Sequence, residues 1–213
     1  MFSAISEGIL LGFFLAFSIG PAFFALLNTA ISYGFKSGAA LAFGIFFSDL
    51  FFVAITVLLV HFGMSDLLSS PKHQAFLGVV GGIVLIIYGV FHFVNIQGKK
   101  RDMEAIEIKS PKPYLLLIKG FFLNMFNPFV WIFWIATSTA ISSKYEANIY
   151  RIIVFFLSVL CMVISTDLLK TFIAHKIKKM LTPIALVRVK YVSGAMLIVF
   201  GLYLIYNVFF LHR

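Results

Sequence analysis

The hydrophobic residues of this chain gather in long runs that are separated by shorter polar segments. A membrane-spanning helix needs about 20 mostly apolar residues, and each of these runs is of that order. Spanning strands would instead show runs of about ten residues with alternating polarity, a pattern that the sequence lacks. We therefore predict six transmembrane helices, at residues 8–29, 39–60, 76–95, 115–140, 149–169 and 191–211.

The composition supports this reading of the runs. Of the 213 residues, 62% are hydrophobic and 12% are charged, whereas a soluble domain has about 25% charged residues. A soluble core of this length has no room for so much apolar surface, so we expect a bilayer to cover it. Residues 1–7 contain no Lys or Arg. Because a secretory signal needs a positive start, we expect the first run to be a retained helix.

The basic residues fall mainly on one side of this six-helix scheme. The loops after the first, third and fifth helices hold 13 of the 17 Lys and Arg residues, and the opposite side holds 4. The positive-inside rule then predicts cytoplasmic long loops and both termini outside the cell membrane. The net charge of +9 thus indicates contact with anionic membrane lipid and not with nucleic acid.

Two polar segments differ in character. Residues 99–114 mix both signs of charge and end in Pro111-Lys112-Pro113, so we predict a cytoplasmic linker there. Residues 170–182 place apolar residues at helical spacing among lysines. That pattern predicts a basic helix lying on the cytoplasmic membrane surface.

The two halves of the chain carry similar features in the same order. These features are a Gly-Phe-Phe-Leu sequence, a following proline, one acid in the second helix and two glycines seven residues apart in the third. In the first half these features are residues 12–15, Pro21, Asp49, Gly82 and Gly89. In the second half they are residues 120–123, Pro128, Asp167, Gly194 and Gly201. A three-helix unit followed by its copy must enter the membrane from the opposite side. We therefore predict an all-α integral membrane protein of two inverted three-helix repeats, at residues 1–98 and 115–213.

The matched prolines predict a break in the first helix of each half, at Gly20-Pro21 and at Asn127-Pro128. Proline has no N–H, so the carbonyls of Phe17 and Asn124 lose their helical partner. Bare carbonyls bind an ammonium group, and the positive end of a half-helix binds a carboxylate, so the breaks suit a zwitterion. The side chains of Asn124 and Asn127 share a face there. The alternative is an ordinary proline kink of a spanning helix.

Each half also carries one acid inside a predicted span. Asp49 lies 11 residues after Gly38 and 12 before His61, which places it near the middle of the bilayer. Such a charge is costly, so we expect a proton or cation site facing a cavity, with a structural Asp bonded to a helix neighbour as the alternative. Asp167 lies three residues before Lys170. It is either part of the site or one half of an interfacial ion pair.

These residues resemble those of a known family, the lysine exporter (LysE-type) translocators, which include homoserine/threonine exporters. The resemblance covers nearly the whole chain. It is carried by Gly20, Pro21, Asn28, Gly34, Gly38, Gly44 and Asp49 in the first half, and by Asn124, Asn127 and Pro128 in the second. Three positions depart from the family pattern: Ile19 replaces a Pro, Ser48 replaces a Gly before Asp49, and Phe129 replaces a Lys.

The resemblance implies export of amino acids or similar small zwitterionic solutes across the bacterial cytoplasmic membrane, driven by the proton-motive force. A cation exporter of the same superfamily and a non-transporting membrane scaffold are the alternatives. The expected partners are the solute, a coupling proton and membrane lipid, and the oligomeric state stays open. The expected site residues are Gly20, Pro21, Asn28, Asp49, Asn124, Asn127, Pro128 and Asp167. With one cysteine, Cys161, and no HExxH sequence, we expect no metal, no cofactor and no enzymatic activity.

Overall fold

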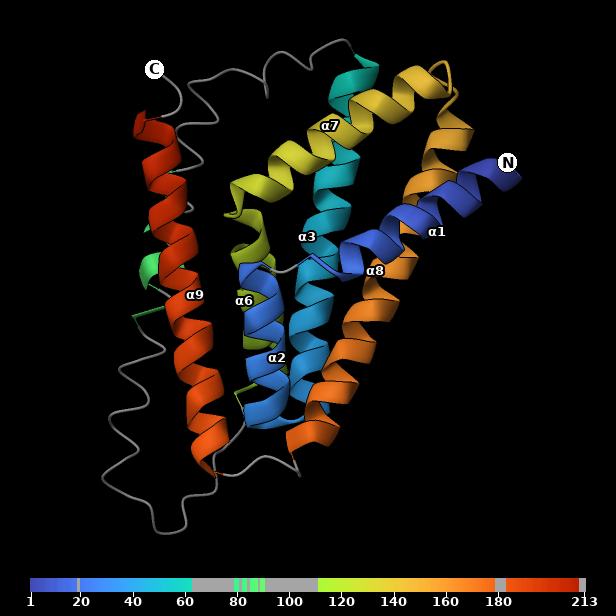
Figure 1. Ribbon diagram of the computed structural model, residues 1–213. Helices are drawn as coiled ribbons and strands as arrows, with labels where there is room; N and C mark the ends of the chain where they lie inside the picture. The colour runs from blue at the N-terminus through green and yellow to red at the C-terminus, as the bar shows by residue number, and fades with distance from the viewer. Residues whose placement is uncertain are drawn as a thin grey trace.

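The described part of the chain is helical apart from short turns. The computed structural model describes residues 1–18, 20–62, 79–80, 82–83, 85–87, 89–90, 111–178 and 183–210. Its helices are α1 (Phe2–Ala16), α2 (Pro21–Tyr33), α3 (Phe35–His61), α6 (Pro113–Met125), α7 (Pro128–Lys144), α8 (Ile149–Lys178) and α9 (Pro183–Phe210) (Figure 1). The described residues between 79 and 90 are also helical.

Two of the described helices, Phe35–His61 and Ile149–Ile177, are long and apolar enough to cross a membrane. The number becomes four when each of the bent pairs α1/α2 and α6/α7 counts as one span. The shorter apolar helix Tyr191–Tyr203 lies within α9. An all-helical membrane protein is therefore confirmed. The predicted run 76–95 lies mostly outside the described residues, and the two-repeat architecture stays a prediction.

Both predicted breaks are present. The axes of α1 and α2 differ by 70°, and those of α6 and α7 by 68°. Each second helix begins with a proline, Pro21 or Pro128, whose missing N–H and fixed φ suit the first position of a helix. Figure 1 shows the two bends near the middle of the bundle, with α2 beside α6. Both helix breaks therefore lie in the interior part of the bundle and not at one of its ends.

Close glycine contacts hold α3 against α6. A β-carbon added at Gly44 would collide with the carbonyl oxygen of Leu117, and one added at Gly120 would collide with that of Leu41. The backbones of the two helices touch at both points. Small residues at such crossings are how membrane helices gain packing contacts without a hydrophobic driving force. This contact places the α6–α7 bend beside the middle of α3.

The same kind of contact joins α1 to α8. A β-carbon at Gly8 would lie 2.5 Å from the carbonyl oxygen of Phe155, and one at Gly12 would lie 2.9 Å from that of Val159. The first helix of the chain thus packs on a helix of the second half. It fixes the α1–α2 bend against the same part of α8 that carries Asp167.

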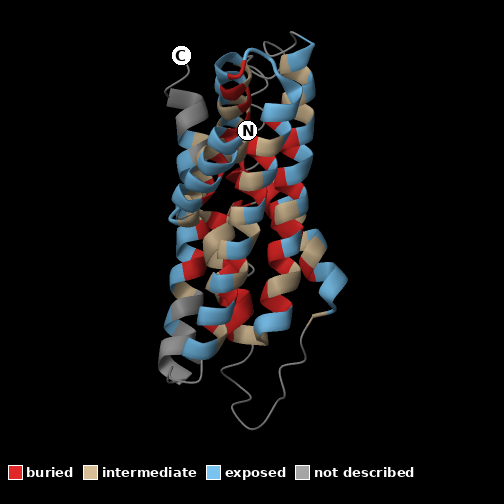
Figure 2. Ribbon diagram, turned by 90° about the vertical axis from the view of Figure 1, so that its right-hand side faces the viewer, coloured by how far each residue is buried: buried red, intermediate tan, exposed pale blue. Residues whose placement is uncertain are grey.

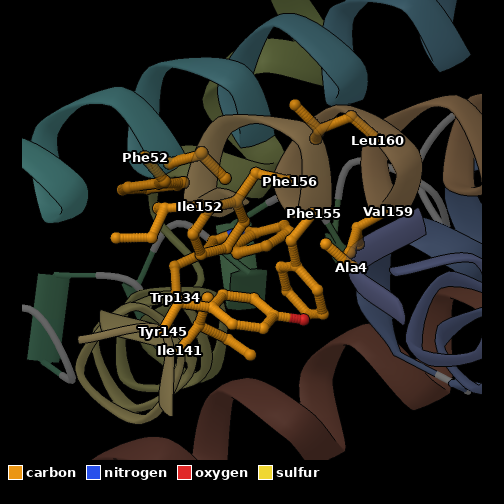
Figure 3. Close-up of a cluster of buried hydrophobic side chains, with 11 residues drawn as sticks. Ala4, Phe52, Trp134, Ile141, Tyr145, Ile152, Phe155, Phe156, Val159 and Leu160 are labelled. Carbon is orange, nitrogen blue, oxygen red and sulfur yellow. The ribbon is translucent and has the colours of Figure 1, made fainter. Parts of the chain in front are cut away.

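The largest buried cluster fills the space between α1, α3, α7 and α8 (Figure 3). Its members are Ala4, Phe52, Val53, Trp134, Ile141, Tyr145, Ile152, Phe155, Phe156, Val159 and Leu160. Figure 2 shows buried residues on the inner faces of the helices and exposed ones on the outer faces. Many exposed residues are large and apolar, among them Phe14, Phe122 and Leu157. An apolar outer surface is what lipid contact requires.

The prediction of a separate surface helix at 170–182 is wrong for its first nine residues, because α8 continues through them to Lys178. The rest of that segment lies outside the described residues. The reason is packing by small side chains. Thr171 is fully buried and would touch a β-carbon at Gly38, and Ala174 packs with residues of α2. These contacts hold the basic segment in the bundle.

A polar contact ties the start of the chain to the turn between α7 and α8. Lys144 Nζ lies 2.7 Å from Glu7 Oε2, and the Tyr145 hydroxyl donates to the same oxygen at 2.9 Å. Burial raises the pKa of Tyr145 to about 12, and its bond to Glu7 adds to the rise. The hydroxyl therefore remains a donor at physiological pH.

Candidate functional site

A cavity of about 450 Å³ lies where the two bends meet α3 and α8. Pockets for small ligands span about 300–1,000 Å³. The polar residues that line it include Ser18, Asp49, Asn124, Asn127, Asp167 and Lys170. The cavity therefore collects polar groups from both halves of the chain in the interior of the bundle.

Asp49 lies at the centre of this site. It is near the middle of α3 and only 7% exposed. Its Oδ1 accepts two hydrogen bonds, from Asn124 Nδ2 at 2.9 Å and from Trp134 Nε1 at 3.0 Å. Within the described part of the chain, no hydrogen bond reaches Oδ2 and no Lys or Arg pairs with the carboxyl. Both donors are neutral and come from other helices, not from a neighbour on α3.

Trp134 was not predicted as a site residue. It is 2% exposed, and its ring packs against Phe156 at a centroid distance of 6.0 Å within the main cluster (Figure 3). The apolar body is thus fixed in the core, and the indole N–H points at Asp49. A buried indole N–H usually finds an acceptor. The presence of a Trp in the apolar helix after the predicted break is therefore the sequence feature that could have identified Trp134 as a site residue.

Asn127 shapes the α6–α7 bend. Its Oδ1 accepts the N–H of Phe129 at 3.2 Å, and its carbonyl accepts the N–H of Val130 at 3.0 Å. It is therefore the N-cap of α7, the role for which Asn is favoured. Its own N–H bonds the carbonyl of Asn124 at 3.1 Å. The prediction that this carbonyl is bare is wrong, because the chain turns back on itself before Pro128.

The α1–α2 bend lacks a side-chain cap of the kind that Asn127 provides for α7. Gly20 is the N-cap of α2 in an extended conformation, with no side-chain cap. The first amides of a helix have no partner inside it. Ala22 and Phe23 belong to this first turn, and both line the cavity. The positive end of α2 therefore faces the cavity.

Asp167 and Lys170 form the predicted ion pair, with 2.8 Å between Oδ1 and Nζ. Their side chains are 12% and 19% exposed, and both line the cavity. Lys170 Nζ also lies 5.9 Å from the ring centre of Phe23. Asp167 therefore forms the ion pair and also lines the cavity, and its part in a binding site stays a prediction. Because α8 runs on to Lys178, Asp167 lies deeper in its helix than predicted.

The cavity gathers six of the eight predicted site residues, namely Gly20, Pro21, Asp49, Asn124, Asn127 and Asp167. Pro128 is the first residue of α7, at the bend. Asn28 is different, since it is buried on α2 outside the lining and its Oδ1 accepts the Ser32 hydroxyl at 3.4 Å.

Comparison with known proteins identifies a family and a relative. The family described as "LysE type translocator" matches residues 13–208. A protein of Bacillus subtilis (strain 168), named "Putative amino acid efflux protein YcgF", is 25% identical in an alignment that covers 93% of this chain and 93% of that protein. No solved structure matches the chain.

Proposed function

The chain belongs to the LysE type translocator family, which consists of transporters and not of enzymes, and we propose that it exports amino acids or similar small zwitterionic solutes from the bacterial cytoplasm. The observation that carries this proposal is the interior cavity between two broken helices, with a carboxyl group at its centre. Broken helices at mid-membrane are where secondary transporters bind their solutes. The similarity to a protein named for amino acid efflux supports the same solute class.

The geometry offers complementary groups for a zwitterion. The positive end of α2, at Ala22 and Phe23, suits a carboxylate. Asp49 has one carboxylate oxygen, Oδ2, without a hydrogen bond from the described residues, and it suits an ammonium group. We propose Gly20, Pro21, Asp49 and Asp167 as part of this site.

A proton is the proposed coupling ion, and Asp49 is its proposed carrier. An acid in the membrane interior that faces a cavity is a candidate for proton relay. The groups that hold Asp49 are an amide and an indole, neither of which carries charge. The carboxyl can therefore gain or lose its proton without breaking an ion pair.

Alternating access through two inverted repeats is the proposed mechanism. Two equivalent contacts support it: Gly12 of α1 packs on α8, which carries Asp167, and Gly120 of α6 packs on α3, which carries Asp49. The first helix of each half thus packs on the acid-bearing helix of the other half. An experimental structure should superpose residues 8–95 on 115–211 by a rotation of about 180° about an in-plane axis. A parallel relation would contradict the proposal.

The function is tested with the purified chain in liposomes. Vesicles loaded with one unlabelled amino acid at a time should take up the same labelled amino acid by counterflow. An imposed pH gradient should then drive net movement of that solute against its own gradient. Absence of counterflow for every amino acid would reject the proposal, and counterflow without any response to the pH gradient would reject only the coupling ion.

A further inference from the structure

Resting on the proposed function, we infer that the solute is an amino acid with an uncharged, apolar side chain, and that Lys170 is the residue that holds its carboxylate. The first step is the charge of the cavity. The described lining contains three charged side chains: Asp49, Asp167 and Lys170. Asp167 and Lys170 pair with each other, so they add no net charge. Asp49 is then the one acid of the described lining without an ion-pair partner.

The second step concerns the carboxylate of the solute. An ammonium group has three N–H donors, and the bond from Lys170 to Asp167 uses one of them. Nζ also lies beside the ring of Phe23, in the first turn of α2. The cation therefore lies near the first turn of α2, and a carboxylate placed between the two would gain from both the cation and the positive helix end.

The third step concerns the rest of the solute. The ammonium group of the solute pairs with Asp49. A second cation on the solute would then find no unpaired acid in the described lining. A second carboxylate would find no further Lys or Arg there. Burial of an unpaired charge is costly. Ser18, Asn124, Asn127 and Trp134 add uncharged polar groups to the lining. Most of the other lining residues are apolar, among them Leu26, Ile45, Val130, Phe133, Val163 and Phe200. A branched or aromatic side chain fits such a lining.

The test is competition in liposome counterflow of labelled leucine by the native chain. Unlabelled leucine and phenylalanine should compete well. Lysine, glutamate and leucinamide, which lacks the carboxylate, should each compete about tenfold more weakly or worse, the scale of one lost hydrogen bond to a charged group. Stronger competition by lysine or glutamate than by leucine would overturn this inference and leave the proposed function intact. Exchange of no amino acid at all would overturn both.

The role of Lys170 is tested by the ratio of competition between leucine and leucinamide. Lys170→Gln should bring this ratio close to one, and Lys170→Arg should restore part of it. Lys176→Gln is the matched control, because Lys176 is an exposed lysine on the same helix that lies over the ring of Phe172, outside the cavity lining. It should keep the native ratio.

Lys170→Gln leaves Asp167 without its partner and is expected to lower folding yield. The double variant Asp167→Asn/Lys170→Gln removes both charges together and avoids this problem. It should run as a single species on gel filtration and show the same loss of preference for leucine over leucinamide. A native ratio in the folded double variant would show that Lys170 does not contact the carboxylate.

Discussion

The side-chain amide of Asn124 donates a 2.9 Å hydrogen bond to the carboxylate of Asp49 and so joins the α6–α7 bend to the middle of α3. This bond connects a helix break of one half to the acid of the other. Movement of the bend must therefore change what surrounds the acid. The link gives a direct route by which solute binding at the bend and proton binding at the acid affect each other.

Asp49→Asn keeps the shape of the side chain and removes its ability to release a proton. We expect this variant to lose efflux driven by a pH gradient and to keep only part of its counterflow of the same solute, because Asn offers no charge to the ammonium group of the solute. Both are measured in liposomes with a labelled amino acid. Glu146→Gln, an exposed acid in the α7–α8 turn, is the matched control and should behave as the native chain. Gradient-driven efflux at the native rate would mean that Asp49 is structural.

The two indoles near the bend allow a paired comparison. Trp134 donates to Asp49, whereas Trp131 donates to the carbonyl of Met125 at 2.9 Å. Replacement of either by Phe keeps a ring and removes one bond, with a net cost of about 1 kcal/mol in stability. Only Trp134→Phe should change the pH at which efflux is half-maximal. An equal change in both variants would contradict a specific link between the indole and Asp49.

The glycine contacts predict where an added methyl group is tolerated. Gly44→Ala and Gly120→Ala push a β-carbon into a backbone carbonyl of the facing helix, so each should cost about 1–3 kcal/mol, the usual cost of overpacking. Gly20→Ala has no atom within 4 Å of the new carbon. The midpoint of thermal unfolding of the Gly20→Ala variant in detergent should match that of the native chain. The ranking fails if Gly20→Ala is the least stable of the three.

The distribution of basic residues predicts the orientation. In a chain whose Cys161 is replaced by Ala, a cysteine at position 143 should react with an impermeant reagent added outside intact cells. A cysteine at position 106 should react only after the membrane is opened, because the positive-inside rule places that loop in the cytoplasm. The opposite labelling pattern would invert the proposed topology.

The features that the sequence predicts well are those set by local chemistry. A proline cannot continue a helix, so both breaks follow from Pro21 and Pro128 alone. The pair Asp167–Lys170 follows from a spacing of three residues on a helix. The mid-helix depth of Asp49 follows from counting residues along an apolar run. Two glycines of the repeat pattern also pack closely, because a β-carbon added at Gly82 or at Gly201 would collide with the carbonyl oxygen of the other.

The features that the sequence does not predict depend on packing between distant segments. Trp134 reaches Asp49 only because the core fixes its ring. The carbonyl of Asn124 is bonded because the chain reverses at Asn127. The lysines after residue 170 are typical of a membrane surface, yet Thr171 and Ala174 have the small side chains that let α8 pack as one long helix. Composition alone does not reveal such contacts.

The packing of α1 on α8 sets the order in which the protein can be completed. Gly8 and Gly12 touch backbone atoms of Phe155 and Val159, residues that the ribosome adds much later. The glycine face of the first helix therefore has no native packing partner until α8 is inserted. The α1 side of the cavity can form only after that step, and Phe200 of α9 is added to the lining later still. A chain truncated before residue 149 would enter the membrane without ever forming a site.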